Sequence, residues 1–124
     1  MERIEKEVFM RKTEFIKEKL NQWYRDLEVE FVDEIGRNIN LSLEFYTYDA
    51  TGNICIVSKE TVTGEPYSRL TVNVGKVADN EVVADTNNFP LAGVILSEYG
   101  IAENTYKRIQ SGFCSYPVYR LIGV

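Results

Sequence analysis

The hydrophobic residues of this chain change their spacing near residue 30, and this change constrains the fold more than any other feature. Up to Leu27 they recur every three or four residues, which is the spacing of one face of an α-helix. The pattern predicts a long amphipathic N-terminal helix over residues Ile4 to Leu27, about 35 Å in length at ~1.5 Å per residue. The apolar positions are Ile4, Val8, Phe15, Ile16, Leu20, Trp23, Tyr24 and Leu27.

Beyond this helix, apolar residues alternate with polar ones, which is the spacing of a half-buried β-strand. Short turns containing Gly52 and Gly64 separate the alternating stretches, so neighbouring strands are expected to pair in an antiparallel meander of about four strands. In the third strand, Leu70, Val72 and Val74 are expected to share one face. The expected strands are Ile39–Tyr46, Ile54–Lys59, Tyr67–Val74 and a shorter one at Glu81–Ala84.

A second, short helix is predicted over Pro90 to Tyr99. Proline suits a first helical turn, Asn87 or Asn88 can serve as the N-cap, and Gly100 is a suitable stop. The remaining residues, 101–124, suggest an irregular aromatic C-terminal segment, with a final short strand over Tyr119 to Ile122 as an option. The whole chain is therefore expected to form a single α+β domain over residues 1–124, with the N-terminal helix over 1–28 packed on a sheet formed within 39–124.

The composition excludes several common chemistries. Histidine is absent, which removes Ser-His-Asp triads, Cys-His pairs and His-ligated zinc. The net charge of −5 argues against direct nucleic acid binding, which normally requires a basic face. Cys55 and Cys114 lack the spacing of a metal site, and no apolar stretch resembles an export signal or a membrane span. We therefore expect a cytoplasmic protein with reduced thiols, no metal and no cofactor.

Two segments are candidates for a binding site. The first contains Asp85, Asn87 and Asn88 between a strand and a helix, where backbone N–H groups and polar side chains could hold a ligand. The same side chains could instead cap the helix and stabilise the turn. The second runs from Ser111 to Arg120 and combines small residues, a thiol and three aromatic side chains. Its candidate residues are Ser111, Phe113, Tyr116, Tyr119 and Arg120.

The aromatic side chains of the second segment could provide a recognition loop, or they could fold back to complete the core. Catalysis by Cys114 would require a base or a positive environment to form the thiolate, and no histidine can supply one. Cys55 lies among apolar strand residues and is expected in the core. In the N-terminal helix, Phe15, Trp23 and Tyr24 are expected to pack on the sheet.

Four ordered motifs between Tyr46 and Arg120 resemble a known family, a domain of unknown function encoded on conjugative and other mobile elements of gut bacteria. The resemblance implies a small cytoplasmic accessory protein of a mobile element or phage, and it implies no reaction, cofactor or substrate. The N-terminal helix lies outside it. The motifs are Gly64-Glu65-Pro66-Tyr67, Leu70-Thr71-Val72-Asn73, Asp85-Thr86-Asn87-Asn88 with Pro90, and Ser111-Gly112-Phe113-Cys114-Ser115-Tyr116-Pro117 ending at Tyr119-Arg120.

Three functional hypotheses follow. The first is a non-enzymatic module that binds another protein, for example to inhibit a host defence nuclease, whose basic channel an acidic protein could occupy. The second is a small enzyme that uses carboxylate or thiol chemistry near Asp85 and Cys114. The third is a structural homodimer that pairs through the N-terminal helix, whose first turns carry Ile4 and Val8. The first hypothesis is favoured because no catalytic set is visible.

Overall fold

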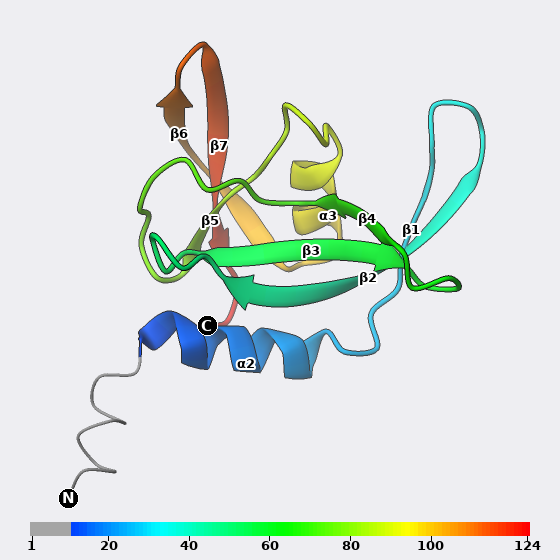
Figure 1. The fold of residues 1–124 in the computed structure, drawn as a ribbon, viewed down its shortest axis with the longest axis horizontal. Helices are drawn as coiled ribbons and strands as arrows, with labels where there is room; N and C mark the ends of the chain where they lie inside the picture. Colours follow the sequence, from blue (N-terminus) through cyan, green and yellow to red (C-terminus); the bar gives the residue numbers. More distant parts are fainter. Residues whose placement is uncertain (1–10) are drawn as a thin grey trace, which may run out of the picture.

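The computed structural model describes residues 11–124, which form two helices and two antiparallel sheets (Figure 1). The first sheet has the strand order β1-β2-β3-β4, and the second has the order β5-β7-β6. This arrangement confirms the expected α+β class with antiparallel pairing. The elements are α2 (Lys12–Trp23), β1 (Val29–Val32), β2 (Asn38–Thr47), β3 (Ile54–Glu60), β4 (Pro66–Arg69), β5 (Glu81–Val83), α3 (Ala92–Glu98), β6 (Ala102–Ser111) and β7 (Cys114–Leu121).

The prediction of a long N-terminal helix was wrong at its C-terminal end. Helix α2 ends at Trp23, where the Tyr24 N–H donates to the Leu20 carbonyl, and a turn follows. No glycine or proline marks this helix end in the sequence. The helix ends here because the chain must turn so that Val29 can enter the core. The part of the predicted helix before residue 11, including Ile4 and Val8 and any pairing surface on them, lies outside the described residues.

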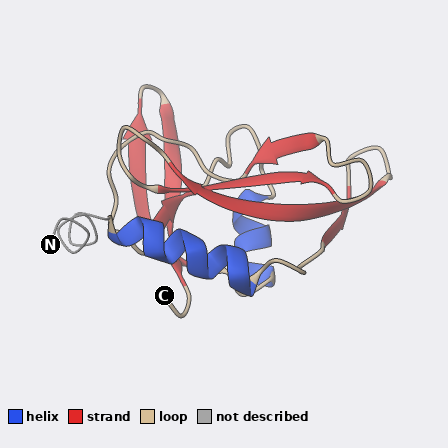
Figure 2. Cartoon of the chain, turned by 60° about the horizontal axis from the view of Figure 1, so that its bottom comes forward, coloured by secondary structure: helices blue, strands red, loops and turns tan. Residues whose placement is uncertain are grey.

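The buried face of α2 also differs from the expectation. Thr13, Ile16 and Leu20 are buried, whereas Phe15 and Trp23 are about half exposed. Positions 13, 16 and 20 lie on one narrow stripe of the helix, residue 23 lies beside that stripe, and residue 15 lies on another side of the helix. The helix runs along β2 and covers one face of the first sheet (Figure 2).

Asn21 fixes α2 on this sheet through the backbone of a single strand residue. Its amide nitrogen donates to the Phe45 carbonyl at 2.8 Å, and its amide oxygen accepts from the Phe45 N–H at 3.0 Å. Strand β1 pairs with β2 only over residues 38–41, so the far half of β2 lacks a strand partner on this side. Asn21 supplies hydrogen-bond partners for the Phe45 backbone, which no strand pairs on this side, and this contact sets the position of the helix along the strand.

Strand β2 confirms the predicted alternation, with Ile39, Leu41, Leu43 and Phe45 all buried. The third predicted strand is shorter than expected, because β4 ends at Arg69. The following residues cross from the first sheet to the second. The Leu70 N–H still donates to the Ile56 carbonyl of β3, whereas the Leu70 carbonyl accepts from the Asp85 N–H. Thr71 then bridges Ala84, and the Val72 N–H donates to the Val83 carbonyl. The expected single meander is therefore two sheets that are joined at this crossing.

The C-terminal segment is a β-hairpin, so the prediction of an irregular aromatic tail was wrong. Strands β6 and β7 pair from Ala102–Leu121 to Ser111–Cys114, with an irregularity between Asn104 and Arg108. Residues 116–119 of β7 are all buried, because both faces of this strand are covered. A strand that is buried on both faces shows no polar-apolar alternation, which removed the signal on which the prediction relied.

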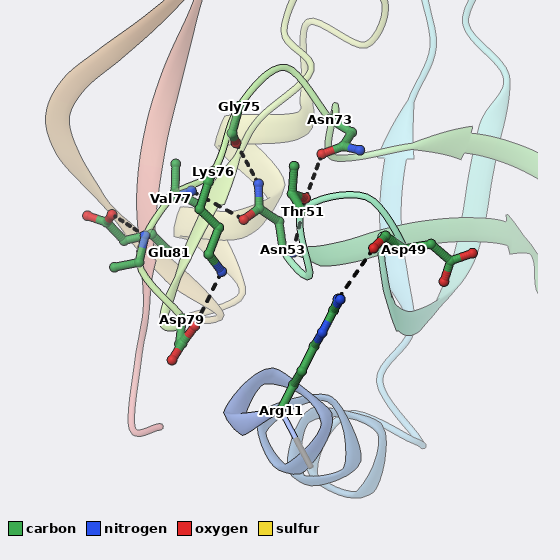
Figure 3. A network of polar contacts seen from close by, with 11 residues as sticks. Arg11, Asp49, Thr51, Asn53, Asn73, Gly75, Lys76, Val77, Asp79 and Glu81 are labelled. Carbon is green, nitrogen blue, oxygen red and sulfur yellow. Dashed lines mark hydrogen bonds and ion pairs between the residues drawn. The ribbon is translucent and has the colours of Figure 1, made fainter. Parts of the chain in front are cut away.

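The long connection between β4 and β5 is held by Asn53, a buried asparagine in the turn between β2 and β3 (Figure 3). The Asn53 amide nitrogen donates to the Gly75 carbonyl at 2.6 Å, and its amide oxygen accepts from the Val77 N–H at 3.2 Å. Beside it, the Thr51 hydroxyl donates to the Asn73 side chain at 2.8 Å. These contacts give an irregular segment the backbone partners that it would otherwise find only in a sheet.

We predict that Leu20→Ala lowers the free energy of unfolding by about 2–5 kcal/mol, because Leu20 is fully buried and its loss leaves a cavity. Phe15→Ala should lower it by less than about 1 kcal/mol, because that ring is half in water. Urea denaturation followed by circular dichroism measures both values. A larger loss for Phe15→Ala than for Leu20→Ala would contradict the described face of α2.

Candidate functional site

The first predicted site segment is organised around a buried carboxylate that is already bound within the chain. Asp85 accepts from the Asn88 backbone N–H at 3.3 Å, and its second oxygen accepts from the Asn88 amide at 3.1 Å. The Asp85 carbonyl accepts from the Phe89 N–H at 2.8 Å. Asn87 is exposed at the apex of this turn. Neither asparagine caps α3, whose N-cap is Leu91 with no side-chain hydrogen bond.

The second predicted segment is divided between the core and the solvent. Tyr116 and Tyr119 are buried, whereas Ser111 and Phe113 lie at the exposed turn between β6 and β7. Phe113 is wholly exposed. Arg120 is bound by Glu103 on the neighbouring strand in an exposed ion pair. The candidate residues 111–120 therefore do not form one surface.

Tyr119 supports α3 through a close contact with a glycine. A Cβ atom placed on Gly93 would lie 2.3 Å from the Tyr119 hydroxyl oxygen and 3.0 Å from the adjacent ring carbon. Only glycine allows the helix to approach β7 this closely. These contacts show that Tyr119 positions α3.

The fold does bring the two predicted segments together at one junction. The Ala84 N–H donates to the Pro117 carbonyl, so the chain leading to Asp85 lies beside Tyr116. A hydrogen bond with Cys114 and burial raise the pKa of the Tyr116 hydroxyl, and the Asp85 charge adds to this effect. A raised pKa keeps this tyrosine neutral, and Asn88 already binds the carboxylate. The junction therefore resembles a structural contact between strands more than a catalytic centre.

A different region, which the sequence did not reveal, holds an open hollow with an aromatic lining. Three aromatic rings from separate elements meet there: Phe31 of β1, Tyr67 of β4 and Phe89 before α3, with centroids 5.9–6.2 Å apart. They form the floor of an open pocket of about 560 Å³. The pocket is lined by Phe31, Val32, Asp33, Glu34, Ile35, Arg37, Tyr67, Asn88, Phe89, Pro90 and Leu91.

A second hollow of about 240 Å³ shares Phe31 and Leu91 with the first and continues between β1 and α3. We refer to the two together as the β1–α3 groove. Its walls present Val32, Ile35, Leu91 and Val94, which are between 37% and 75% exposed. An exposed apolar surface of this kind, set in a concave site, is typical of a binding surface.

The turn between β1 and β2 forms one wall of the groove and is stiffened by an aspartate. Asp33 accepts from the N–H groups of Ile35 at 3.1 Å and Arg37 at 2.8 Å, and its other oxygen accepts from the Arg37 guanidinium at 2.7 Å. Hydrogen bonds from the Arg37 backbone and side chain hold the pKa of Asp33 below its usual value. The wall therefore keeps its shape although it projects beyond the sheet (Figure 1).

Of the predicted site residues, only Asn88 lines this groove. Sequence reasoning missed the groove because its floor is assembled from three segments that are far apart in the chain, and because β1 was not predicted. One available signal was Phe31-Val32 followed by Ile35, three large apolar side chains in an otherwise polar stretch.

Among residues 11–124, no group of three side chains could hold a metal ion, and no helix is long and apolar enough to span a membrane.

We predict that Gly93→Ala lowers the free energy of unfolding by about 1–3 kcal/mol, because the new methyl group would overlap the Tyr119 hydroxyl. On helix propensity alone the change would be stabilising by about 1 kcal/mol. Adding Tyr119→Phe should restore part of the loss, and urea denaturation of the two single variants and the double variant measures the coupling. Simple additivity would contradict the contact.

We predict that Glu81 stabilises the folded protein more at neutral pH than in acid. Burial acts to raise its pKa, but hydrogen bonds from Lys107 and the Ala78 N–H outweigh burial and leave the pKa below its usual value of 4.5. A lowered pKa in the folded state stabilises the protein above pH 4.5, and this stabilisation is lost as the pH falls below it.

Glu81→Gln should therefore lower the free energy of unfolding at pH 7 by about 1 kcal/mol, a value reduced by solvent screening of the exposed Lys107. The difference from the unchanged protein should shrink toward pH 3. Glu103→Gln, which breaks a pair on the same sheet in which both side chains are about half exposed, is the control and should cost less than about 0.5 kcal/mol. A Glu81→Gln effect that stays constant from pH 7 to pH 3 would refute this role.

Comparison with known proteins gives one match. Residues 40–122 match a family described as a domain of unknown function (DUF4313). The match runs from β2 through β7 and includes Tyr67 and the 88–91 side of the groove, but neither α2 nor β1. No curated protein and no solved structure matches the chain. The family covers well over half of the sequence, and the chain belongs to the DUF4313 family of domains of unknown function.

Proposed function

We propose that this protein is a non-enzymatic accessory protein that binds another protein through the β1–α3 groove. The observation that carries the proposal is the aromatic floor of Phe31, Tyr67 and Phe89 beneath exposed apolar walls. Aromatic side chains in a concave site supply much of the binding energy at protein interfaces, because they bury a large area and have few rotatable bonds. Partner residues could bury the exposed parts of Val32 and Ile35 in the same contact.

The groove is also well prepared for binding because its parts are rigid. The Asp33 hydrogen bonds hold one wall, and the Asp85–Asn88 turn holds the other. A preorganised surface loses little conformational entropy when a partner binds, so more of the contact energy remains as affinity. This gives the Asp85–Asn88 segment a supporting role in the proposed site.

We further propose that the protein acts in the cytoplasm for a mobile element, for example by inhibiting a host defence nuclease. The support is the resemblance of residues 46–120 to proteins of conjugative and other mobile elements of gut bacteria, together with the net charge of −5. An acidic protein is attracted to the basic channel of a nuclease, which favours association. The domain itself is not proposed to contact nucleic acid.

The β6–β7 hairpin is a second candidate surface for the same function. Tyr106 is 87% exposed, with a backbone φ of 63°, and Phe113 is wholly exposed. A non-glycine residue with positive φ is strained, and such strain is often found at functional positions. The two aromatic side chains are separated along the hairpin and no described hollow joins them, so we rank this surface below the groove.

Affinity capture from a lysate of gut bacteria tests the proposal and compares the two surfaces. Immobilised protein should retain one or more specific partners. Val32→Ser with Ile35→Ser should reduce retention at least about tenfold, the effect of losing about 1.4 kcal/mol of contact energy. Both side chains are mostly exposed, so the fold should remain, as urea denaturation can verify.

Phe113→Ser with Tyr106→Asn reports on the hairpin, and Val62→Ser, at a 90% exposed position outside the groove, controls for lost surface hydrophobicity. Retention that depends on the hairpin variant and not on the groove variant would move the site to the hairpin. No specific partner at any salt concentration would refute the proposed function.

A further inference from the structure

The outer edge of β1, which lines the groove, carries backbone groups that point away from β2. Directly after β1 the Asp33 N–H donates to the Arg37 carbonyl, so the Asp33 N–H points toward β2, and residues that point toward β2 and away from it alternate back along β1. Glu30 and Val32 are then the residues whose N–H and C=O groups point away from β2. The Thr61 N–H confirms the alternation, since it donates to the Asn40 carbonyl on the other side of β2.

One of these two edge positions is satisfied and the other is not. The Tyr99 hydroxyl accepts from the Glu30 N–H at 2.8 Å and reaches the Glu30 carbonyl at 3.4 Å. Val32 makes no such contact within residues 11–124, and its side chain is 59% exposed. An edge residue with free backbone groups beside an apolar groove is able to pair with an added strand.

The charged side chains around the groove have one predominant sign. Arg37 is the only basic residue that lines either hollow, and Asp33 binds it. The other charged lining residues are Glu30, Glu34 and Glu98, and none of the ion pairs in residues 11–124 involves them. Three carboxylates without basic partners therefore lie around the apolar β1–α3 groove.

We infer that the groove binds an extended segment of the partner protein that carries basic side chains. This inference rests on the proposed function and specifies its partner. The segment adds to the first sheet beside β1 and exchanges a backbone hydrogen bond with Val32. It places an apolar side chain over Phe31 and Leu91, and it directs lysine or arginine side chains toward the rim carboxylates.

An extended segment fits these observations better than a helix does. A helix satisfies its own backbone groups and would leave Val32 unpaired, whereas an added strand supplies the missing partner. The alternation of side chains along a strand also lets one residue enter the groove while its neighbours reach the rim. The mild acidity of the whole chain attracts such a basic segment before contact.

A phage-displayed library of random twelve-residue peptides, selected on the immobilised full chain, provides the probe. The enriched peptides are synthesised and titrated by fluorescence polarisation. The expected consensus contains an apolar residue flanked by lysine or arginine. Val32→Ser with Ile35→Ser should weaken the binding of these peptides, as the proposed site requires.

Two further measurements test the inferred details. The double variant Glu34→Gln with Glu98→Gln should weaken peptide binding about fivefold, which is the effect expected from losing two exposed charge pairs. The matched control, Glu18→Gln with Asp49→Asn, removes two exposed carboxylates outside the groove and should leave binding unchanged. N-methylation removes one backbone N–H donor of the peptide at a time. Methylation at one position should weaken binding about fivefold, whereas methylation at the two neighbouring positions should leave the affinity unchanged, because an added strand pairs through alternate residues.

Peptides that need the groove but tolerate Glu34→Gln with Glu98→Gln, or that bind as helices without a sensitive amide, would overturn the inference and leave the proposed function standing. A library that yields no groove-dependent peptide would also overturn it. The proposed function is decided separately by capture from the lysate, which does not depend on the form of the partner segment.

Discussion

The pairing of Thr71 with Ala84 is the contact on which the arrangement of the two sheets depends. Thr71 is buried, and its hydroxyl accepts from the Ile56 N–H at 3.0 Å and lies 3.0 Å from the Tyr48 hydroxyl. The same residue therefore contacts β3 through its side chain and the end of β5 through its backbone. Partial burial at this junction raises the pKa of Tyr48 to about 12, so the tyrosine stays neutral.

This junction also places the proposed site. Because the chain crosses from β4 to the second sheet at residues 70–72, the turn that follows β5 returns beside the first sheet. Phe89 and Leu91 then meet Phe31 and Tyr67, which belong to the opposite edges of that sheet's strand order. The groove is therefore a consequence of joining the two sheets, and a change that loosened the junction would be expected to disturb it.

Local patterns predicted much of the fold. The alternation from Ile39 to Phe45 identified β2, and the position of Cys55 among apolar residues correctly placed it in the core. The same reasoning failed for β7, where residues 116–119 are buried on both faces and no alternation exists. It also failed for α2, because the stripe of Thr13, Ile16 and Leu20 contains a threonine, whereas the more hydrophobic Phe15 and Trp23 stay half exposed. The candidate site was predicted only in part, since Asn88 lines the groove but Tyr116 and Tyr119 are core residues.

The sequence by itself determined the α+β class, the central strands and the absence of histidine chemistry, because each follows from composition or from contacts within a few residues of the chain. Only the tertiary structure decided that there are two sheets, that the aromatic C-terminal residues form a hairpin, and that Phe31, Tyr67 and Phe89 share one groove. The physical reason is that the joining of the two sheets and the shared groove depend on contacts between separate segments of the chain, and hydrophobic periodicity carries no information about which segments meet. The hairpin was missed because residues 116–119 of β7 are buried on both faces and show no alternation.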